Sequence, residues 1–155
     1  MPEGEPGGTP VSERRRPEPR AAYRWFREVG LHWRDNDVYG HVNNVVHYAW
    51  FDTTVNAWLL EQGFLRPDAR LAGFVVASGC DYFAEVAFPA RVDCGLRAGR
   101  IGSSSVRNEL ALFRHGEALS LAAGQLTHAY VRWPERRREP LPPDLRERLA
   151  DLRAS

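Results

Sequence analysis

Lysine is absent from this sequence, and methionine and cysteine are rare. All 21 basic residues are arginine and are matched by 20 acidic residues, which leaves a formal net charge of +1. A chain this close to neutral has no field that attracts nucleic acid non-specifically, so no nucleic-acid partner is expected. The two cysteines, Cys80 and Cys94, are too few for a disulfide framework and too far apart for a metal knuckle, although a single disulfide between them stays open.

Long apolar runs are absent as well. No stretch approaches the roughly 18 residues that a membrane-spanning helix needs, and residues 1–20 lack the apolar centre of a signal peptide. We therefore expect a soluble cytoplasmic protein that makes no membrane contact. Its 155 residues, 43% of them hydrophobic, are enough for one domain with its own core.

Three segments differ in composition. Residues 1–20 contain five prolines and three glycines and offer little apolar surface to bury, so they are expected to form a flexible leader. Residues 21–140 carry periodic apolar patterns and form the predicted domain. Residues 141–155 include the run PPDLRERLADL, which predicts a short C-terminal helix with Asp144 as its cap, followed by a tail.

Apolar periodicity within the domain predicts one long helix among strands. Residues 23–33 alternate in the way typical of a half-buried strand. From Val42 to Gln62 the apolar period is helical, so we expect a helix of about twenty residues that Asn43 or Asn44 caps and Gly63 ends. Further strands are expected within 71–83, 92–98, 106–112 and 117–133, with hairpin turns at 100–103 and 115–116.

The order of these elements predicts the fold class. One strand, one long helix and four further strands favour an α+β architecture in which the sheet is largely antiparallel. The economical arrangement is a curved antiparallel sheet of about five strands wrapped round the central helix. The apolar stripe of the helix would then be buried against the concave face of the sheet.

The densest polar cluster lies just before the predicted helix. It contains Asp35, Asp37, His41, Asn43 and Asn44. The unpaired amides at a helix start carry partial positive charge, so this cluster could supply both an acid and donors for a developing oxyanion. The same residue types are also ordinary in a loop that caps a helix, and composition by itself leaves both interpretations open. The spacing matches neither a calcium loop nor a zinc motif.

Asp52 is a second unusual position. It is predicted near the centre of the apolar helical stripe, between Tyr48 and Val55, where an acid is costly unless it has a partner. A hydrogen bond to a loop or a tyrosine would explain it equally well. His128, on the last predicted strand, is interpreted as a core or interface histidine.

The run DNDVYGHVNNVVHYAWFD, from Asp35 to Asp52, resembles the D-x-D-x-x-G-H-V-N-N signature, followed by a tyrosine and an acid, of 4-hydroxybenzoyl-CoA thioesterase-like proteins. The likeness extends over about residues 23–149, including the last strand QLTHAYVRW. The resemblance implies a hot-dog fold and a homodimer with a continuous sheet, often paired into tetramers. It also implies hydrolysis of the thioester of acyl-CoA or acyl-carrier protein, with no cofactor because CoA is part of the substrate.

The resemblance also implies roles for residues. Asp37, the second acid of the motif, would attack the thioester carbonyl or activate water, and His41 would orient the acid, the water or the loop. Amides around Asn43 and Asn44 would polarise the carbonyl oxygen. The implied catalytic set is therefore Asp37, His41, Asn43 and Asn44, and the implied substrate pocket contains Tyr39, Gly40, Tyr48 and Asp52.

Three questions stay open after this comparison of motifs. Some relatives carry the essential acid on the helix, where this chain has Asp52. The phosphates of CoA have candidate partners in Arg100, Arg107 and residues 136–138, which the sequence does not rank. A non-catalytic acyl-binding protein is one alternative function, and a hydratase or dehydratase that uses Asp37 and His41 is another, although this sequence lacks the His-Phe-Pro type loop of dehydratases.

Overall fold

The structure is a computed structural model that describes residues 15–153. One antiparallel sheet holds its strands in the order β1-β3-β4-β5-β2, and the two-residue strand β6 pairs with β5. The bounds are β1 Trp25–Val29, β2 Leu71–Tyr82, β3 Val92–Ile101, β4 Ser105–Arg114, β5 Ala122–Arg132, β6 Arg137–Arg138, α1 Asn44–Gln62 and α2 Pro143–Asp151. The expected hot-dog fold, a curved antiparallel sheet with one long helix against it, is confirmed.

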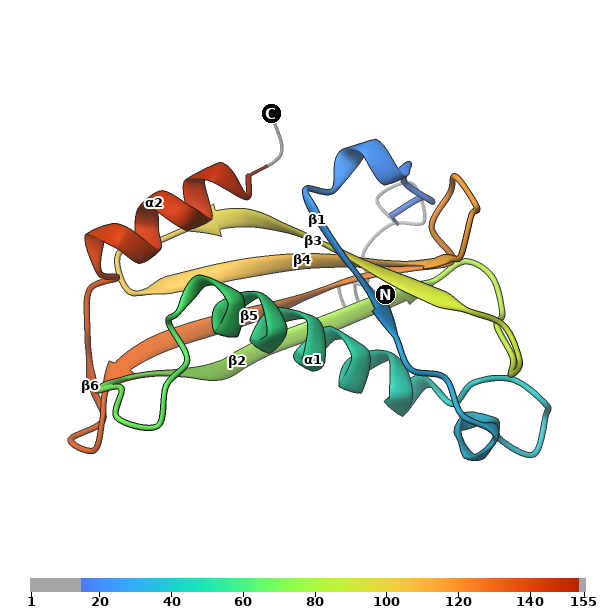
Figure 1. Cartoon of the computed structure of the whole chain (residues 1–155), viewed down its shortest axis with the longest axis horizontal. Coiled ribbons are helices and arrows are strands. Elements are labelled where there is room, and N and C mark those ends of the chain that lie inside the picture. Colours follow the sequence, from blue (N-terminus) through green and yellow to red (C-terminus); the bar gives the residue numbers. More distant parts are fainter. Residues whose placement is uncertain (1–14, 154–155) are drawn as a thin grey trace, which may run out of the picture.

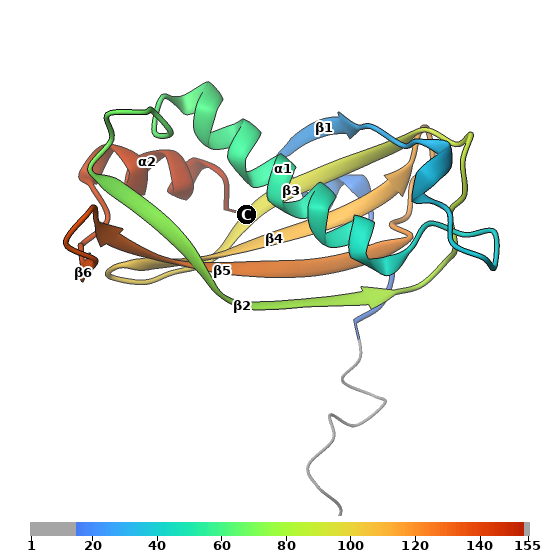
Figure 2. The same ribbon diagram turned by 90° about the horizontal axis from the view of Figure 1, so that it is seen from below.

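The helix α1 lies across one face of the curved sheet, and α2 packs at the end where β3 turns into β4 (Figures 1 and 2). The core forms where α1 meets the middle strands: Phe51 of the helix, Leu96 of β3 and Leu110 of β4 are all fully buried. In the described part of the chain, no helix is both long enough and apolar enough to cross a membrane.

The ends of α1 agree with the prediction. The side-chain oxygen of Asn43 accepts a hydrogen bond from the Val45 amide at 3.1 Å, which makes Asn43 the cap. Gly63 ends the helix with φ of 85°, a left-handed conformation that glycine adopts without strain.

The predicted buried stripe of α1 was wrong in its centre. Val45 is 67% exposed and Asp52 is exposed, whereas Trp50 and Trp58, expected beside the stripe, are buried. The two tryptophans lie on the buried face because a tryptophan side chain buries more apolar surface against the sheet than valine or aspartate would. Asp52 therefore needs no buried partner in this chain.

Smaller differences concern element boundaries. The first strand ends at Val29, so that Leu31 and Trp33 lie in the following loop. The turn between β3 and β4 comprises residues 102–104 rather than 100–103. The structure caps α2 with Pro142 and begins the helix at Pro143, so Asp144 lies in the first turn and is not the cap. Proline suits the first helical position because it has no amide hydrogen to leave unpaired.

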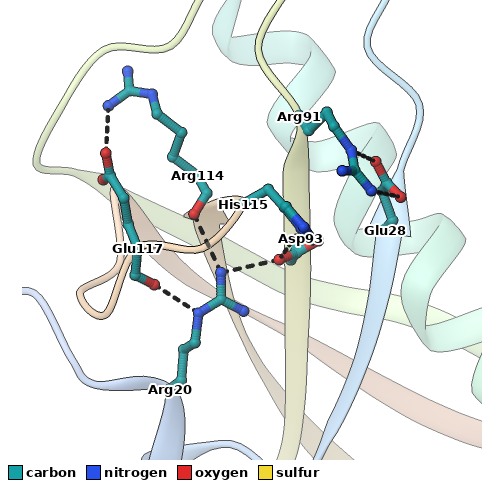
Figure 3. A network of polar contacts seen from close by, with 7 residues as sticks. All are labelled: Arg20, Glu28, Arg91, Asp93, Arg114, His115 and Glu117. Carbon is teal, nitrogen blue, oxygen red and sulfur yellow. Dashed lines mark hydrogen bonds and ion pairs between the residues drawn. The ribbon is translucent and has the colours of Figure 1, made fainter.

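Part of the expected leader packs on the domain. The Glu18 amide donates to the hydroxyl of Ser120 at 2.9 Å, and the Arg20 guanidinium donates to Asp93 at 2.9 Å while it lies 4.9 Å from the centre of the Phe113 ring. Figure 3 shows the contact of Arg20 with Asp93, and Asp93 also faces the imidazole of His115. Residues 1–14 of the leader and 154–155 of the tail lie outside the described residues.

The two edges of the sheet differ. β1 is a short edge, whereas β2 is a long edge strand on which Phe74, Val75 and Val76 are 43%, 48% and 61% exposed. Cys80 on β2 and Cys94 on β3 are free thiols, so the optional disulfide is not formed.

Candidate active site

The loop between β1 and α1 is organised by its acids. Asp35 closes a single turn of 3₁₀ helix, Trp33–Asp35, and its carboxylate accepts a 2.8 Å hydrogen bond from the His32 amide. Its backbone carbonyl accepts a hydrogen bond from the Asn43 amide at 2.9 Å. This contact brings the start of the loop next to the start of α1, which explains why the polar cluster is compact.

Asp37 lies at the beginning of a tight turn. Its carboxylate oxygen Oδ1 accepts a 2.8 Å hydrogen bond from the Tyr39 amide, and its backbone carbonyl accepts from the Gly40 amide at 3.1 Å. Gly40 has φ of 82°, which the turn requires and which glycine tolerates best. Within residues 15–153 the second carboxylate oxygen, Oδ2, has no hydrogen-bond partner. The carboxylate is thus held in one orientation with one oxygen free.

His41 follows the turn and connects the loop to the chain between β2 and β3. The His41 carbonyl accepts from the Asp37 amide at 2.8 Å, and the His41 Nε2 atom lies 2.8 Å from the carboxylate of Glu85. The next residue, Val42, donates its amide to the Val86 carbonyl at 2.8 Å. Sequence reasoning missed Glu85, because only the folded chain brings residues 41 and 85 together.

The first turn of α1 places the ring of His47 against the ring of Tyr82 from β2. His47 is buried and its ring centroid lies 4.9 Å from that of Tyr82, at the end of β2. Burial lowers the pKa of His47 below its usual range, and its hydrogen bond to the Asn43 carbonyl partly opposes this. Burial raises the pKa of Tyr82, which the side chain of Asn44 partly offsets. The sequence pattern contained no signal for Tyr82.

A shallow hollow of about 540 Å³ lies against the Asp37 turn. Trp33, Asn36, Asp37, Val38 and Gly40 all line it. Trp33 is 74% exposed and Val38 is 93% exposed, so this chain presents large apolar side chains to solvent on both sides of the carboxylate. Apolar surface beside a few polar groups is typical of a small-molecule site.

Tyr48 and Asp52 lie farther along α1 than the rest of the predicted set. Tyr48 is half-buried and packs edge-on against Phe51, with 6.1 Å between ring centroids. Asp52 is exposed, and its charge acts on His128 of β5: burial lowers the pKa of His128, and Asp52 partly raises it again. The Nδ2 atom of Asn108 lies 3.0 Å from Nδ1 of His128, so the buried imidazole is hydrogen-bonded.

The structure therefore brings some of the predicted site residues together and leaves others farther along α1. Asp37, Gly40 and His41 share one turn, and the Asn43 amide at the helix start donates to the carbonyl of Asp35, just before that turn. Tyr39 lies on the same turn, where its side chain is 81% exposed. Among residues 15–153, no group of three or more His, Cys, Asp or Glu side chains is arranged to hold a metal ion.

Residues 31–149, most of the chain, match the thioesterase-like superfamily. The chain belongs to this family. Among solved structures, the chain is similar to the PA5185 protein from Pseudomonas aeruginosa, with 47% sequence identity and a TM-score of 0.86 over 90% of this chain and 99% of that protein.

A thioesterase from Thermus thermophilus, solved in complex with coenzyme A and zinc, is 27% identical, with a TM-score of 0.71 over 84% of this thioesterase-like chain and 95% of that protein. Among curated proteins, the uncharacterized protein YsmA of Bacillus subtilis is 21% identical over 87 residues, 56% of this chain. The match spans 59% of the length of YsmA.

Proposed function

We propose that this chain hydrolyses the thioester of an acyl-CoA, with the Asp37 carboxylate as nucleophile or general base. Its family and its thioesterase neighbours, one of which was solved with coenzyme A, support thioester hydrolysis as the reaction class. The observation that carries the proposal is the Asp37 turn. It holds one carboxylate oxygen with the Tyr39 amide, leaves the other oxygen without a partner among residues 15–153, and lines a hollow with apolar walls.

The chemistry needs few groups. Aspartate side chains are generally ionised at neutral pH, as a base or nucleophile must be. As base, the carboxylate takes a proton from water while the water oxygen bonds to the carbonyl carbon. The carbon–sulfur bond then breaks, which gives a carboxylic acid and the CoA thiol. As nucleophile, the carboxylate forms an acyl-enzyme anhydride that water hydrolyses in a second step. A thiolate leaves readily, so a separate strong acid is unnecessary.

The start of α1 is the proposed site for the carbonyl oxygen. Asn43 already caps the Val45 amide, but the Asn44 amide has no hydrogen-bond partner in the described range. A free amide at a helix start stabilises developing negative charge on the oxygen. His41, paired with Glu85, is proposed to fix the loop that carries Asp37.

Two copies of the chain are proposed to pair through the β2 edges, because a long edge strand with exposed apolar residues is a template for another strand.

The acyl pocket is proposed to be lined by Tyr39, Gly40, Tyr48 and Asp52. An acyl-carrier protein is the second candidate carrier, and no cofactor besides the CoA of the substrate is invoked. Location in the cytoplasm and assembly of dimers into tetramers stay predictions.

The decisive experiment follows free thiol release from short, long and aromatic acyl-CoAs. We compare the full-length protein with Asp37→Asn, and with Asp35→Asn as a matched control from the same loop, where asparagine still accepts the His32 hydrogen bond. Asp37→Asn should lower kcat by roughly 10²–10⁴-fold, the contribution typical of a general base. The control should retain most of its activity, and both variants should keep the melting temperature of the wild type.

Other results would contradict the proposal in separate ways. Equal turnover by the wild type and Asp37→Asn would move the essential acid, and Asp52→Asn would then test the helix position. Absence of thiol release from every CoA ester and every acyl-carrier ester would favour an acyl-binding protein without activity.

A further inference from the structure

One guanidinium group lies beside the Asp37 turn without a partner. The loop between β1 and α1 projects beyond the end of the sheet (Figure 1), and Arg34 on this loop lines the same hollow as Asp37. The Arg34 side chain makes no hydrogen bond or ion pair with any residue in 15–153. Because arginine is always ionised in proteins, the hollow carries a positive charge that the described chain leaves unpaired.

The two acids that follow Arg34 in the loop are engaged elsewhere. The Asp35 carboxylate accepts the His32 amide at 2.8 Å and lies 3.6 Å from the His32 ring. The Asp37 carboxylate accepts from the Tyr39 amide through one oxygen, and its other oxygen is needed for the thioester or for water. A carboxylate supplied by the ligand would therefore be the partner that the Arg34 guanidinium lacks.

The backbone on both sides of Arg34 is held in place. Arg34 is the middle residue of the 3₁₀ turn that Asp35 closes. In this turn the Asp35 amide donates to the His32 carbonyl at 2.9 Å, and the Asn36 amide donates to the Trp33 carbonyl at 3.2 Å. A ligand that binds the guanidinium therefore orders little besides one side chain, which limits the entropy lost on binding.

The rest of the hollow suits an apolar chain that ends in hydrogen-bond acceptors. Trp33 and Val38 supply apolar walls, and Oδ1 of Asn36 accepts from the Phe88 amide at 3.2 Å, which leaves Nδ2 as a further donor. Carboxylate oxygens match the planar fork of a guanidinium and pair with it through two hydrogen bonds. The volume of about 540 Å³ is in the range of sites for organic ligands.

We propose that Arg34 selects acyl groups that carry a carboxylate at the end away from the thioester, an inference that rests on the proposed function. While Asp37 acts at the thioester carbonyl, the Arg34 guanidinium binds the distal carboxylate, and the hydrocarbon between them lies against Trp33 and Val38. A neutral chain of the same length would partly desolvate the guanidinium without giving it a partner. The substrates are then monothioesters of dicarboxylic acids.

A distal carboxylate also distinguishes two directions for the acyl group. Of the residues proposed to line the acyl pocket, Gly40 borders this hollow, whereas Tyr48 and Asp52 lie farther along α1. An acyl group that extends along α1 would bring its carboxylate toward the negative charge of Asp52, which repels it. An acyl group that extends toward Arg34 meets the opposite charge.

Pairs of substrates that differ only in charge test the selection. CoA esters of dicarboxylic acids with roughly five to eight carbons are compared with esters of the same length in which the distal carboxylate is a neutral amide. Thiol release by the wild type should favour the carboxylate ester by roughly tenfold in kcat/KM, the usual order for a hydrogen-bonded charge. In Arg34→Gln the preference should fall to about one, with most of the loss on the carboxylate ester.

Two further variants complete the comparison. Arg34→Lys keeps the charge without the planar fork and should keep part of the preference. Arg66→Gln is the control, because Arg66 is an exposed arginine outside the hollow, and it should show the preference of the wild type. All three variants should keep the melting temperature of the wild type.

Binding of inert CoA thioethers gives a readout that does not depend on hydrolysis. These probes carry the same distal carboxylate or amide but have no carbonyl, so the protein cannot cleave them. Calorimetry on the full chain should show a Kd roughly tenfold lower for the carboxylate thioether than for the amide with the wild type, and equal Kd values with Arg34→Gln.

Three kinetic results would overturn the inference. These are a wild type that does not favour the carboxylate ester, a preference that survives in Arg34→Gln, and an equal loss on both esters in Arg34→Gln, which would assign Arg34 to the loop or to Asp37. A wild type that hydrolyses no ester would refute the proposed activity. Thioether binding then decides the inference separately: a preference that depends on Arg34 supports it, and equal Kd values refute it.

Discussion

At the scale of residues, the two candidates for the catalytic acid, Asp37 and Asp52, occupy different surroundings. The Asp37 carboxylate is oriented by a backbone amide and borders a hollow, whereas Asp52 lies exposed on α1 and acts on its neighbour His128 through its charge. A carboxylate held in one orientation loses less entropy when substrate binds. This difference is the reason for assigning the chemistry to Asp37.

The two buried histidines predict a loss of stability in acid. Burial lowers the pKa of His47 and His128 below the ordinary value of 6.5, so below that pH the unfolded chain takes up protons that the folded chain excludes. The free energy of unfolding should therefore fall as the pH drops below about 6.5. Urea unfolding at a series of pH values measures this slope.

His128→Gln should reduce that slope, whatever its effect on stability at neutral pH. His47→Gln is the matched variant: it removes the other buried histidine and should reduce the slope in the same direction. Identical slopes in the wild type and His128→Gln would show that His128 does not contribute.

Gly124 is a position where a side chain does not fit. A Cβ atom there would come within 2.6 Å of the Phe51 ring and would also meet the Gly79 carbonyl oxygen. Gly124→Ala should lower the free energy of unfolding by about 1–3 kcal/mol, the usual cost of overpacking a core. Gly30→Ala, where the nearest atom is a flexible histidine side chain at 3.3 Å, is the control and should cost clearly less in the same denaturant experiment.

At the scale of elements, α1 is the part that the sequence predicted best. Its cap, its length and its terminal Gly63 are local properties, set by hydrogen bonds within a few residues. The buried face of the helix was predicted with the wrong centre. Which face packs depends on the sheet beneath it, and the sheet is assembled from residues far away in the sequence.

The cap of α1 gives a prediction at this scale. Asn43→Ala removes the acceptor for the Val45 amide and should lower the free energy of unfolding by about 1 kcal/mol. The matched variant Asn56→Ala changes the same residue type in the interior of α1, where the side chain does not cap the helix. Thermal or urea unfolding in which Asn56→Ala costs as much as Asn43→Ala would contradict the assigned cap.

At the scale of the whole molecule, the open edge of β2 is the main unfinished feature of the single chain. Val76 lies at a bulge, has no Cα partner in β5 and is 61% exposed. Val76→Lys should therefore leave the chain's own ladder intact while placing a charge in the proposed edge-to-edge interface. Light scattering coupled to gel filtration should show a dimer for the wild type and a monomer for the variant.

The control for this prediction is Leu119→Lys. Leu119 is 56% exposed on the connection between β4 and β5, so it changes an exposed apolar residue away from the β2 edge. A dimer that persists in Val76→Lys, or that is lost equally in Leu119→Lys, would place the interface elsewhere.

Features that depend on neighbours along the chain could be predicted from the sequence: the order of the long strands and helices, the Asn43 cap, the end of α1 at Gly63 and the compact acidic loop before α1. Features that depend on distant residues became visible only in the folded chain. The fold brings Glu85 into contact with His41 and Tyr82 into contact with His47. It leaves Asp52 exposed to solvent. It also brings Arg100, Arg107 and Arg138 to the lining of one pocket. Periodicity records which side chains share a face, but the curvature and order of the sheet determine which distant faces meet.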